Sequence, residues 1–313
     1  MLGLVGDSAA GKTTLTQGIA EILGRDRVSC LCADDYHKYD RTERAVNGIT
    51  PLHPDGNFVD IIEQHLRLLR AGEPILKPVY DHSNGTLARP EYVVPREFVI
   101  MDGLLGFSTP GMRDCFDIKV YLDPPEELRH RWKIKRDCAK RGYQPEQAVK
   151  DLQKREPDSR DFIRPQRASA DVVVRFYPPD ETPAGKSNGH LNVRLVLRAT
   201  IPHPDLSDVI SASQGGRDGR PAAIRIELGR DAGRPVDFLE IDGSLDSKEA
   251  AKLQEVISRH MPGTQEIRPE KIGKYLDGLE ERQSHPLGLT QLLIVYHMLR
   301  AAEAGRKKEG ARG

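Results

Sequence analysis

The sequence lacks a net charge and a long apolar run, and it contains few cysteines. Its 313 residues include 47 basic and 47 acidic side chains, which leaves no global positive field to attract nucleic acid. No apolar run approaches the roughly 20 residues that span a bilayer. The four cysteines lack zinc-site spacing and are too sparse for a disulfide framework, so we expect free thiols. These absences argue against nucleic-acid-binding, membrane and disulfide-rich proteins.

The composition that remains is 38% apolar and 30% charged, which is typical of a globular protein with a core of ordinary size. Met1 stands only a few residues before the first motif, so we expect no signal or transit peptide. We therefore expect a cytoplasmic protein without a membrane or nucleic-acid partner.

Short apolar or β-branched runs alternate with helical patterns in the first half of the chain. This alternation predicts parallel βαβ units, which bind ligands at the carboxyl ends of the strands. We expect one α/β domain over residues 1–180, with a parallel sheet flanked by helices. The expected strands are Leu2–Val5, Val28–Ala33, Phe98–Met101, Ile118–Leu122 and Val172–Phe176.

Glycine or aspartate follows each of the first four expected strands. Gly6 follows the first, Asp34 and Asp35 the second, Asp102 the third and Asp123 the fourth. Because the carboxyl ends of parallel strands meet at one edge of a sheet, we expect these residues to lie near one another.

The composition changes after a connection rich in Pro, Gly and charge at residues 178–189. Residues 190–313 predict a β-rich extension with terminal helices. We expect a homodimer through this extension, because Asn192–Arg198 has no Pro and only two charges and would form a weakly protected edge strand. The expected strands are Asn192–Thr200, Ala222–Leu228 and Val236–Ile241, and the expected helices are Ser247–His260 and Gly288–Glu303.

The clearest motif is a phosphate-binding loop after the first strand. Gly6-Asp7-Ser8-Ala9-Ala10-Gly11-Lys12-Thr13 matches the pattern G-x-x-x-x-G-K-[ST] at every defined position and opens a helical run. Backbone N–H groups and the helix N-terminus can face ATP phosphates there, with Lys12 supplying charge and Thr13 placed for Mg²⁺. The motif predicts nucleotide binding, but alone it does not separate a kinase from a hydrolase or a switch.

An acidic pair, Asp34 and Asp35, follows the second expected strand. A hydroxyl acceptor needs a carboxylate that takes its proton as the phosphoryl group arrives, and either residue can do this. The alternative is that the pair caps a helix or forms a turn. Asp102 ends a Walker B-like strand and is placed to orient Mg²⁺ through water, with a plain turn before Gly103 as its alternative.

The densest basic segment, Arg129–Arg141, has seven Lys or Arg residues against one Asp. On a helix, Lys133, Arg136 and Asp137 share one face, which favours small phosphates and a metal over nucleic acid. A solvated charged face is the alternative. Residues 143–170 are polar and interrupted by Pro, and we expect them to form a lid that keeps water away from ATP.

Together these motifs resemble the phosphoribulokinase family, in particular its plant and cyanobacterial branch. The resemblance covers nearly the whole chain, whereas related uridine kinases do not share the C-terminal half. It includes Lys77–His82, a segment whose residues by themselves predict only a loop between strands. The matching blocks are Gly6–Thr14, Cys32–Thr42, Lys77–His82, Tyr121–Asp123, Trp132–Asp137, Arg155–Asp171 and Phe238–Asp246, with the helix Gly288–Glu303.

The resemblance implies an ATP- and Mg²⁺-dependent kinase of the Calvin cycle that converts ribulose 5-phosphate into ribulose 1,5-bisphosphate. It implies that Asp34 is the catalytic base, that Lys12, Lys133 and Arg136 neutralise phosphate charge, and that Asp137 serves the metal or the transferring group. The residues implied in substrate binding are His37, Arg41, Tyr80, His82, Lys133, Arg136 and Arg141. Those implied in ATP binding are Gly6, Asp7, Ser8, Ala9, Ala10, Gly11, Lys12, Thr13 and Thr14, and those implied in metal binding are Thr13, Asp102 and Asp137.

The sequence departs from the family pattern at several positions. Asp102 stands where the family usually has Glu, and Leu105 replaces a His that commonly follows that acid. Chloroplast members form a redox switch between two cysteines; here Cys32 matches one of them, but Ala10 occupies the place of the other, so we expect no such switch. Two alternatives to the implied reaction remain, namely a kinase for uridine or another sugar phosphate, and a nucleotide-gated binding protein without turnover.

Overall fold

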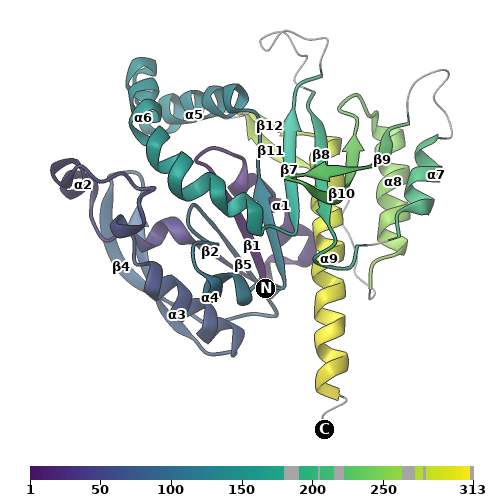
Figure 1. The fold of residues 1–313 in the computed structure, drawn as a ribbon, viewed down its shortest axis with the longest axis horizontal. Helices are drawn as coiled ribbons and strands as arrows, with labels where there is room; N and C mark the ends of the chain where they lie inside the picture. The colour runs from purple at the N-terminus through teal and green to yellow at the C-terminus, as the bar shows by residue number, and fades with distance from the viewer. Residues whose placement is uncertain (180–189, 204, 215–221, 263–271, 278–279, 311–313) are drawn as a thin grey trace. The chain divides into compact units, whose positions relative to one another are not determined.

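The computed structural model describes residues 1–179, 190–203, 205–214, 222–262, 272–277 and 280–310. The chain divides into two compact units, whose elements are labelled in Figure 1. The first unit comprises Met1–Thr16 and Asp26–Ala170, and the second comprises Gln17–Arg25 and Asp171–Gly313. Every residue that the sequence implicates in catalysis belongs to the first unit.

A parallel sheet with the strand order β2-β5-β1-β6 forms the centre of the first unit (Figure 1). Both β1 and β5 are buried along their whole length, as expected for apolar strands covered on two faces. The predicted parallel α/β sheet is therefore confirmed, and the carboxyl ends of its strands meet at one edge. The strands are β1 (Leu2–Gly6), β2 (Val28–Cys32), β5 (Phe98–Gly103) and β6 (Ile118–Leu122).

Helices surround this sheet and carry most of the charged candidate residues. The basic segment lies on α5, and α6 packs beside it (Figure 1). A π-helical turn, Ser159–Ile163, and a 3₁₀ helix, Arg164–Ser169, continue the chain after α6. The helices are α1 (Lys12–Leu23, which ends in the second unit), α2 (Arg41–Asn47), α3 (Val59–Arg70), α4 (Pro110–Asp114), α5 (Glu126–Arg141) and α6 (Pro145–Asp158).

A two-stranded ribbon, β3 (Ile75–Asp81) and β4 (Thr86–Val93), replaces the loop expected at Lys77–His82. That expectation was wrong because the segment does not alternate regularly between apolar and polar residues. Its buried positions include Lys77, whose charge is paired inside the protein. The ribbon positions Lys77 and Tyr80 against the 3₁₀ turn that follows β2.

The second unit contains an antiparallel sheet in the order β7-β8-β10-β9, as expected for a β-rich extension. The expectation that Asn192–Arg198 forms a sheet edge was wrong, because β8 pairs with β7 on one side and β10 on the other. Its elements are β7 (Val172–Tyr177), β8 (Asn192–Arg198), α7 (Ser207–Gln214), β9 (Ile224–Asp231), β10 (Arg234–Ile241), α8 (Ser247–Arg259), β11 (Lys274–Asp277), β12 (Glu280–Gln283) and α9 (His285–Gly310).

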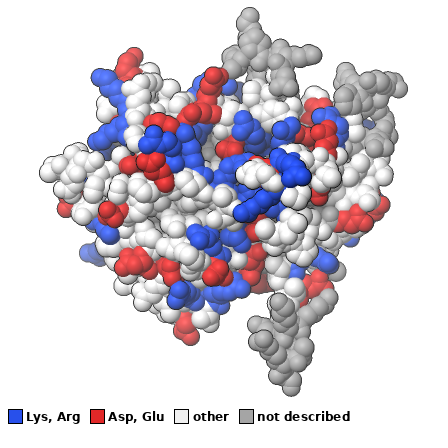
Figure 2. Space-filling view, viewed as in Figure 1, with Lys and Arg blue, Asp and Glu red and all other residues white. Residues whose placement is uncertain are grey.

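Basic and acidic side chains, which are equal in number in the sequence, are also mixed on the surface (Figure 2). Figure 2 shows basic and acidic side chains mixed over much of one face of the molecule. Among the helices that the structure describes, none has both the length and the apolar character needed to cross a bilayer.

Candidate active site

The phosphate-binding loop joins β1 to α1. The Lys12 ammonium donates hydrogen bonds to the carbonyl oxygens of Gly6 at 2.8 Å and Asp7 at 3.0 Å, which holds the side chain within the loop. A Cβ on Gly6 would lie 2.7 Å from the carbonyl oxygen of Leu122 on β6. Gly11 has a φ of 98°, which glycine adopts at little cost. The two glycines thus permit the tight turn that a phosphate cradle requires.

Asp102 ends β5 next to the first turns of α1. Its Oδ2 accepts a hydrogen bond from Thr16 Oγ1 at 2.9 Å, and burial raises its pKa although the Lys12 ammonium acts in the opposite direction. Thr13 is exposed in the first turn of α1, followed by the half-buried Thr14. Mg²⁺ is often held by one or two protein oxygens, several waters and substrate phosphates, and the Thr13 hydroxyl and Asp102 carboxylate fit that donor set.

No group of three or more His, Cys, Asp and Glu side chains within the described part of the chain could hold a metal by itself.

The two acids after β2 lie in different environments. Asp35 forms an ion pair with the buried Lys77, at 2.5 Å between Oδ2 and Nζ, and its Oδ1 accepts a hydrogen bond from the Tyr80 N–H at 3.1 Å. Asp34 accepts one hydrogen bond, from the Leu104 N–H to Oδ1 at 3.2 Å. Asp35 therefore fastens β3 to the turn after β2. The second carboxylate oxygen of Asp34 makes no hydrogen bond to the residues that the structure describes.

His37, Tyr80 and His82 form an edge-to-face stack beside this acidic pair. The ring centroids of His37 and Tyr80 are 4.8 Å apart, and those of Tyr80 and His82 are 4.9 Å apart. The Tyr80 hydroxyl donates to the Gly85 carbonyl oxygen at 3.0 Å and accepts from Arg44, and the residue is only 4% exposed. Tyr80 thus orients the two histidine rings, and its own polar group is directed into the protein.

Two arginines were implied in substrate binding. Arg41, the first residue of α2, is exposed, and its Nη2 donates to the His82 carbonyl oxygen at 3.1 Å. The side chain of Arg141, the last residue of α5, lies outside the described residues. Arg41 therefore places a cation next to the histidine stack.

Lys133 and Asp137 form a fully buried ion pair one turn apart on α5. Lys133 Nζ lies 2.5 Å from Asp137 Oδ2, and Arg136 Nη2 lies 2.9 Å from Oδ1 of the same carboxylate. Arg136 also donates to the Ser8 hydroxyl of the phosphate-binding loop at 3.4 Å. Burial, reinforced by the Arg155 guanidinium, lowers the pKa of Lys133 to about 8. The geometry favours Asp137 as the anchor of two cations over direct metal binding.

Asp7 links the phosphate-binding loop to the segment expected to form a lid. Its Oδ2 accepts a hydrogen bond from Ser159 Oγ and lies 3.4 Å from Arg129 Nη1. All three residues are buried. Part of residues 143–170 therefore touches the nucleotide loop, while the movement of this segment as a lid remains a prediction.

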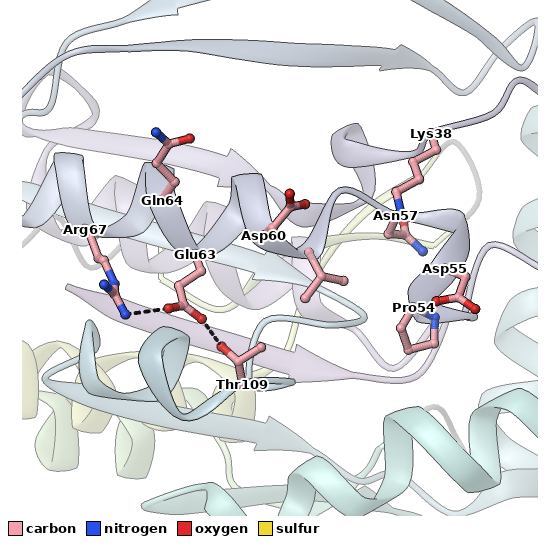
Figure 3. A pocket seen from close by; sticks show the side chains of 10 residues that line it. Lys38, Pro54, Asp55, Asn57, Asp60, Glu63, Gln64, Arg67 and Thr109 are labelled. Atoms are coloured by element: carbon pink, nitrogen blue, oxygen red, sulfur yellow. Dashed lines mark hydrogen bonds and ion pairs between the residues drawn. The ribbon is translucent and has the colours of Figure 1, made fainter.

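A pocket of about 580 Å³ opens beside the His37 segment. Figure 3 shows Lys38 and Asn57 close together in it, and elsewhere along the wall Glu63 bonded to both Arg67 and Thr109. None of its lining residues belongs to the phosphate-binding loop. The full lining is Lys38, Pro54, Asp55, Asn57, Val59, Asp60, Glu63, Gln64, Arg67 and Thr109.

Comparison with known proteins shows which family the chain belongs to. Residues 1–183 match the Phosphoribulokinase / Uridine kinase family. The chain is 34% identical to a phosphoribulokinase of Synechocystis over 97% of its own length and 94% of that protein. This chain belongs to the phosphoribulokinase/uridine kinase family. It is also 30% identical to a chloroplastic phosphoribulokinase of Mesembryanthemum crystallinum, over 79% of this chain and 69% of that protein.

A uridine kinase and a solved structure are also similar to this chain. A uridine kinase of Chlamydia pneumoniae is 33% identical over 56% of this chain and 80% of its own length. The structure of a phosphoribulokinase from Rhodobacter spheroides superposes with a TM-score of 0.57 at 18% identity, over 83% of this chain and 96% of that one, which supports the fold. The predicted P-loop kinase fold is therefore confirmed.

The site also contains residues that the sequence did not single out. Thr16 bonds Asp102, Lys77 pairs with Asp35, Asn57 bonds His37, and Ser159 bonds Asp7. Thr16 lies four residues after Lys12 and so on the same helix face, which is a signal that could have revealed it. The other three reach the site from loops or elements whose placement depends on tertiary packing.

Proposed function

We propose that this family member is an ATP-dependent phosphoribulokinase, which transfers the γ-phosphoryl group of ATP to a hydroxyl of ribulose 5-phosphate. The observation that carries the proposal is similarity to a phosphoribulokinase over 97% of the chain, including the C-terminal extension. Similarity to the uridine kinase covers only 56%, which disfavours a nucleoside acceptor. The product, ribulose 1,5-bisphosphate, assigns the reaction to the Calvin cycle.

In this proposal Asp34 takes the proton of the attacking hydroxyl. Asp35 is less suited to that role because both of its carboxylate oxygens hold β3 in place. A free carboxylate oxygen at the end of β2 can accept a proton while the phosphoryl group arrives in line. Asp34 is thereby favoured over Asp35 as the base.

The basic residues of the first unit would stabilise charge on the transferring group. Lys12 lies in the phosphate-binding loop, and Arg136 reaches the same loop through Ser8. Lys133 is held beside them by Asp137. Fixed positive groups of this kind stabilise a transition state in which charge spreads over the phosphoryl oxygens. A bound Mg²⁺, held by Thr13 and Asp102, would neutralise phosphate charge further.

The proposed reaction can be tested by coupled measurement of ADP release. We expect turnover with ribulose 5-phosphate and far lower rates with uridine and ribose 5-phosphate at equal concentration. Faster turnover with uridine would instead identify a nucleoside kinase. Nucleotide binding without ADP release from any acceptor would identify a binding protein.

We also propose a homodimer, formed through β9 instead of β8. β9 is an outer strand of its sheet, pairing with β10, and Leu228 on it is 82% exposed. Such an edge can pair with its copy about a two-fold axis. Light scattering should then give about twice the chain mass of 35.0 kDa. Leu228→Lys should give a monomer, whereas Val46→Lys, a control at an equally exposed position on α2 of the first unit, should leave the dimer intact. A monomer with full activity would contradict the dimer.

A cytoplasmic location is likewise still a prediction from the sequence.

A further inference from the structure

A short backbone bridge fixes His37 beside Asn57. The two residues form an isolated antiparallel bridge, flanked by hydrogen bonds from the Lys38 N–H to the Gly56 carbonyl oxygen at 2.9 Å and from the Phe58 N–H to the Tyr36 carbonyl oxygen at 2.8 Å. Residues opposite each other in an antiparallel pair direct their side chains to the same side. The backbone therefore brings the imidazole and the carboxamide together.

The hydrogen bonds of Asn57 determine which way its amide points. Its Nδ2 donates to the Pro51 carbonyl oxygen at 3.2 Å and to the His53 carbonyl oxygen at 2.8 Å. Both of these partners are acceptors, so the amide nitrogen must face them and Oδ1 must face His37. Asn57 Oδ1 lies 2.7 Å from His37 Nδ1, and Asn57 is only 3% exposed.

This orientation fixes the proton on the imidazole. An amide oxygen accepts hydrogen bonds and cannot donate them, so His37 Nδ1 must carry a hydrogen. Within the described residues, Nε2 of His37 has no hydrogen-bond partner. When the ring is neutral, Nε2 therefore presents a lone pair.

The surroundings of His37 keep the ring neutral. His37 is 3% exposed, and burial lowers its pKa to about 4. The Asp34 carboxylate acts to raise this pKa, while the nearby Arg44 and His82 act to lower it. The Tyr80 ring covers one side of the imidazole edge-to-face, with ring centroids 4.8 Å apart. At neutral pH Nε2 is thus a hydrogen-bond acceptor.

We propose that Asn57 is a positioning residue that holds His37 in the Nδ1–H tautomer, so that Nε2 accepts a hydrogen bond from a hydroxyl of the acceptor sugar. The inference rests on the proposed function for the identity of the sugar. A neutral acceptor suits an alcohol and would repel a phosphate oxygen, so His37 selects a hydroxyl. The exposed Arg41 would then bind the phosphate group of the sugar. Asn57 acts through His37 and does not itself touch the substrate.

The tautomer can be measured directly on the full chain without substrate. ¹⁵N NMR of histidine-labelled protein distinguishes protonated from unprotonated ring nitrogens, and a His37→Gln sample identifies the His37 signals. We expect a protonated Nδ1 and an unprotonated Nε2 between pH 6 and 8, a range above the pKa of about 4. An Nε2–H tautomer, or an imidazolium at pH 7, would overturn the proposal whatever the substrate is.

Two substitutions test the coupling to the sugar. Asn57→Asp places a carboxylate beside Nδ1, which stabilises the imidazolium and should raise the His37 pKa. Nε2 then carries a hydrogen below that pKa, so the KM for ribulose 5-phosphate should rise about 10-fold at low pH and recover at higher pH, in line with one hydrogen bond. Asn57→Leu removes the acceptor, and its KM should stay high at every pH.

The KM for ATP should be unchanged in both variants. Gln64→Leu is a matched control, because Gln64 lines the same pocket as Asn57 and makes no hydrogen bond to His37 among the described residues. An Asn57→Asp enzyme in which the NMR pKa rises without a pH-dependent change in sugar KM would refute the contact with the hydroxyl. If ribulose 5-phosphate is not the substrate, the wild-type NMR result still decides the tautomer.

Discussion

The contrast between Asp34 and Asp35 gives the sharpest prediction, because the same Asp→Asn change should reduce catalysis at one position and stability at the adjacent one. Asp34→Asn keeps an oxygen that can accept from the Leu104 N–H, so the local structure should persist. It removes the proton acceptor, and loss of a general base typically lowers kcat by about 10² to 10⁴-fold. We expect that loss with small changes in both KM values and in melting temperature.

Asp35→Asn removes the charge partner of Lys77, whose side chain is 6% exposed. Removing one member of a buried ion pair costs about 3–5 kcal/mol. Glu91, 3.7 Å from the Lys77 Nζ, compensates in part, so we expect the lower end of that range. At about 2–4 °C per kcal/mol, the melting temperature should fall by several degrees. Activity measured below the new transition should decline far less than in Asp34→Asn.

Two measurements on each purified variant show which of the two aspartates is the catalytic base. Steady-state ADP release gives kcat and the KM values, and thermal unfolding followed by circular dichroism gives the melting temperature. A loss of kcat in Asp35→Asn with an unchanged melting temperature, together with an active Asp34→Asn, would show that the roles are reversed. A double variant Asp35→Asn/Lys77→Met, which removes both charges, should regain most of the stability lost in Asp35→Asn.

Three further predictions concern other parts of the site. Lys12→Ala should lower kcat by at least about 10² to 10³-fold with little effect on folding, because the hydrogen bonds of Nζ to described residues go to two carbonyl oxygens of the loop; near-normal turnover would contradict the assignment of this loop to nucleotide binding. Lys133, with a pKa of about 8, loses its proton as the pH rises above 8, so kcat/KM for ATP should fall in that range. In Lys133→Arg this fall should occur at a higher pH, because a guanidinium keeps its proton. The free energy of unfolding should instead rise between pH 8 and 10.5, because the unfolded chain still binds this proton in that range and the folded protein does not. Mild oxidation should leave activity unchanged, since Ala10 supplies no thiol to Cys32; a large reversible loss would reveal another regulatory thiol.

The phosphate-binding loop and the sheet that presents it could be predicted from the order of residues along the chain. Gly6, Gly11 and Lys12 are local requirements, because phosphate approach needs glycine conformations and a cation at fixed spacing along the chain. The strands that lead to Gly6 and Asp102 are short apolar runs, which are typical of parallel strands buried on both faces. The parallel sheet places their ends together regardless of the loops between them.

The roles of the individual polar residues, in contrast, depend on contacts made after the chain has folded. Asp34 and Asp35 are chemically equal in the sequence, and they differ because Lys77 reaches one of them from a ribbon more than forty residues away. Asn57 orients His37 through a bridge between two irregular segments, for which no periodic pattern exists. The edge of the second sheet is β9 instead of β8, because strand order depends on which partners pair and not on the residues of one strand. Burial and long-range pairing assign these roles, and neither is encoded in local spacing.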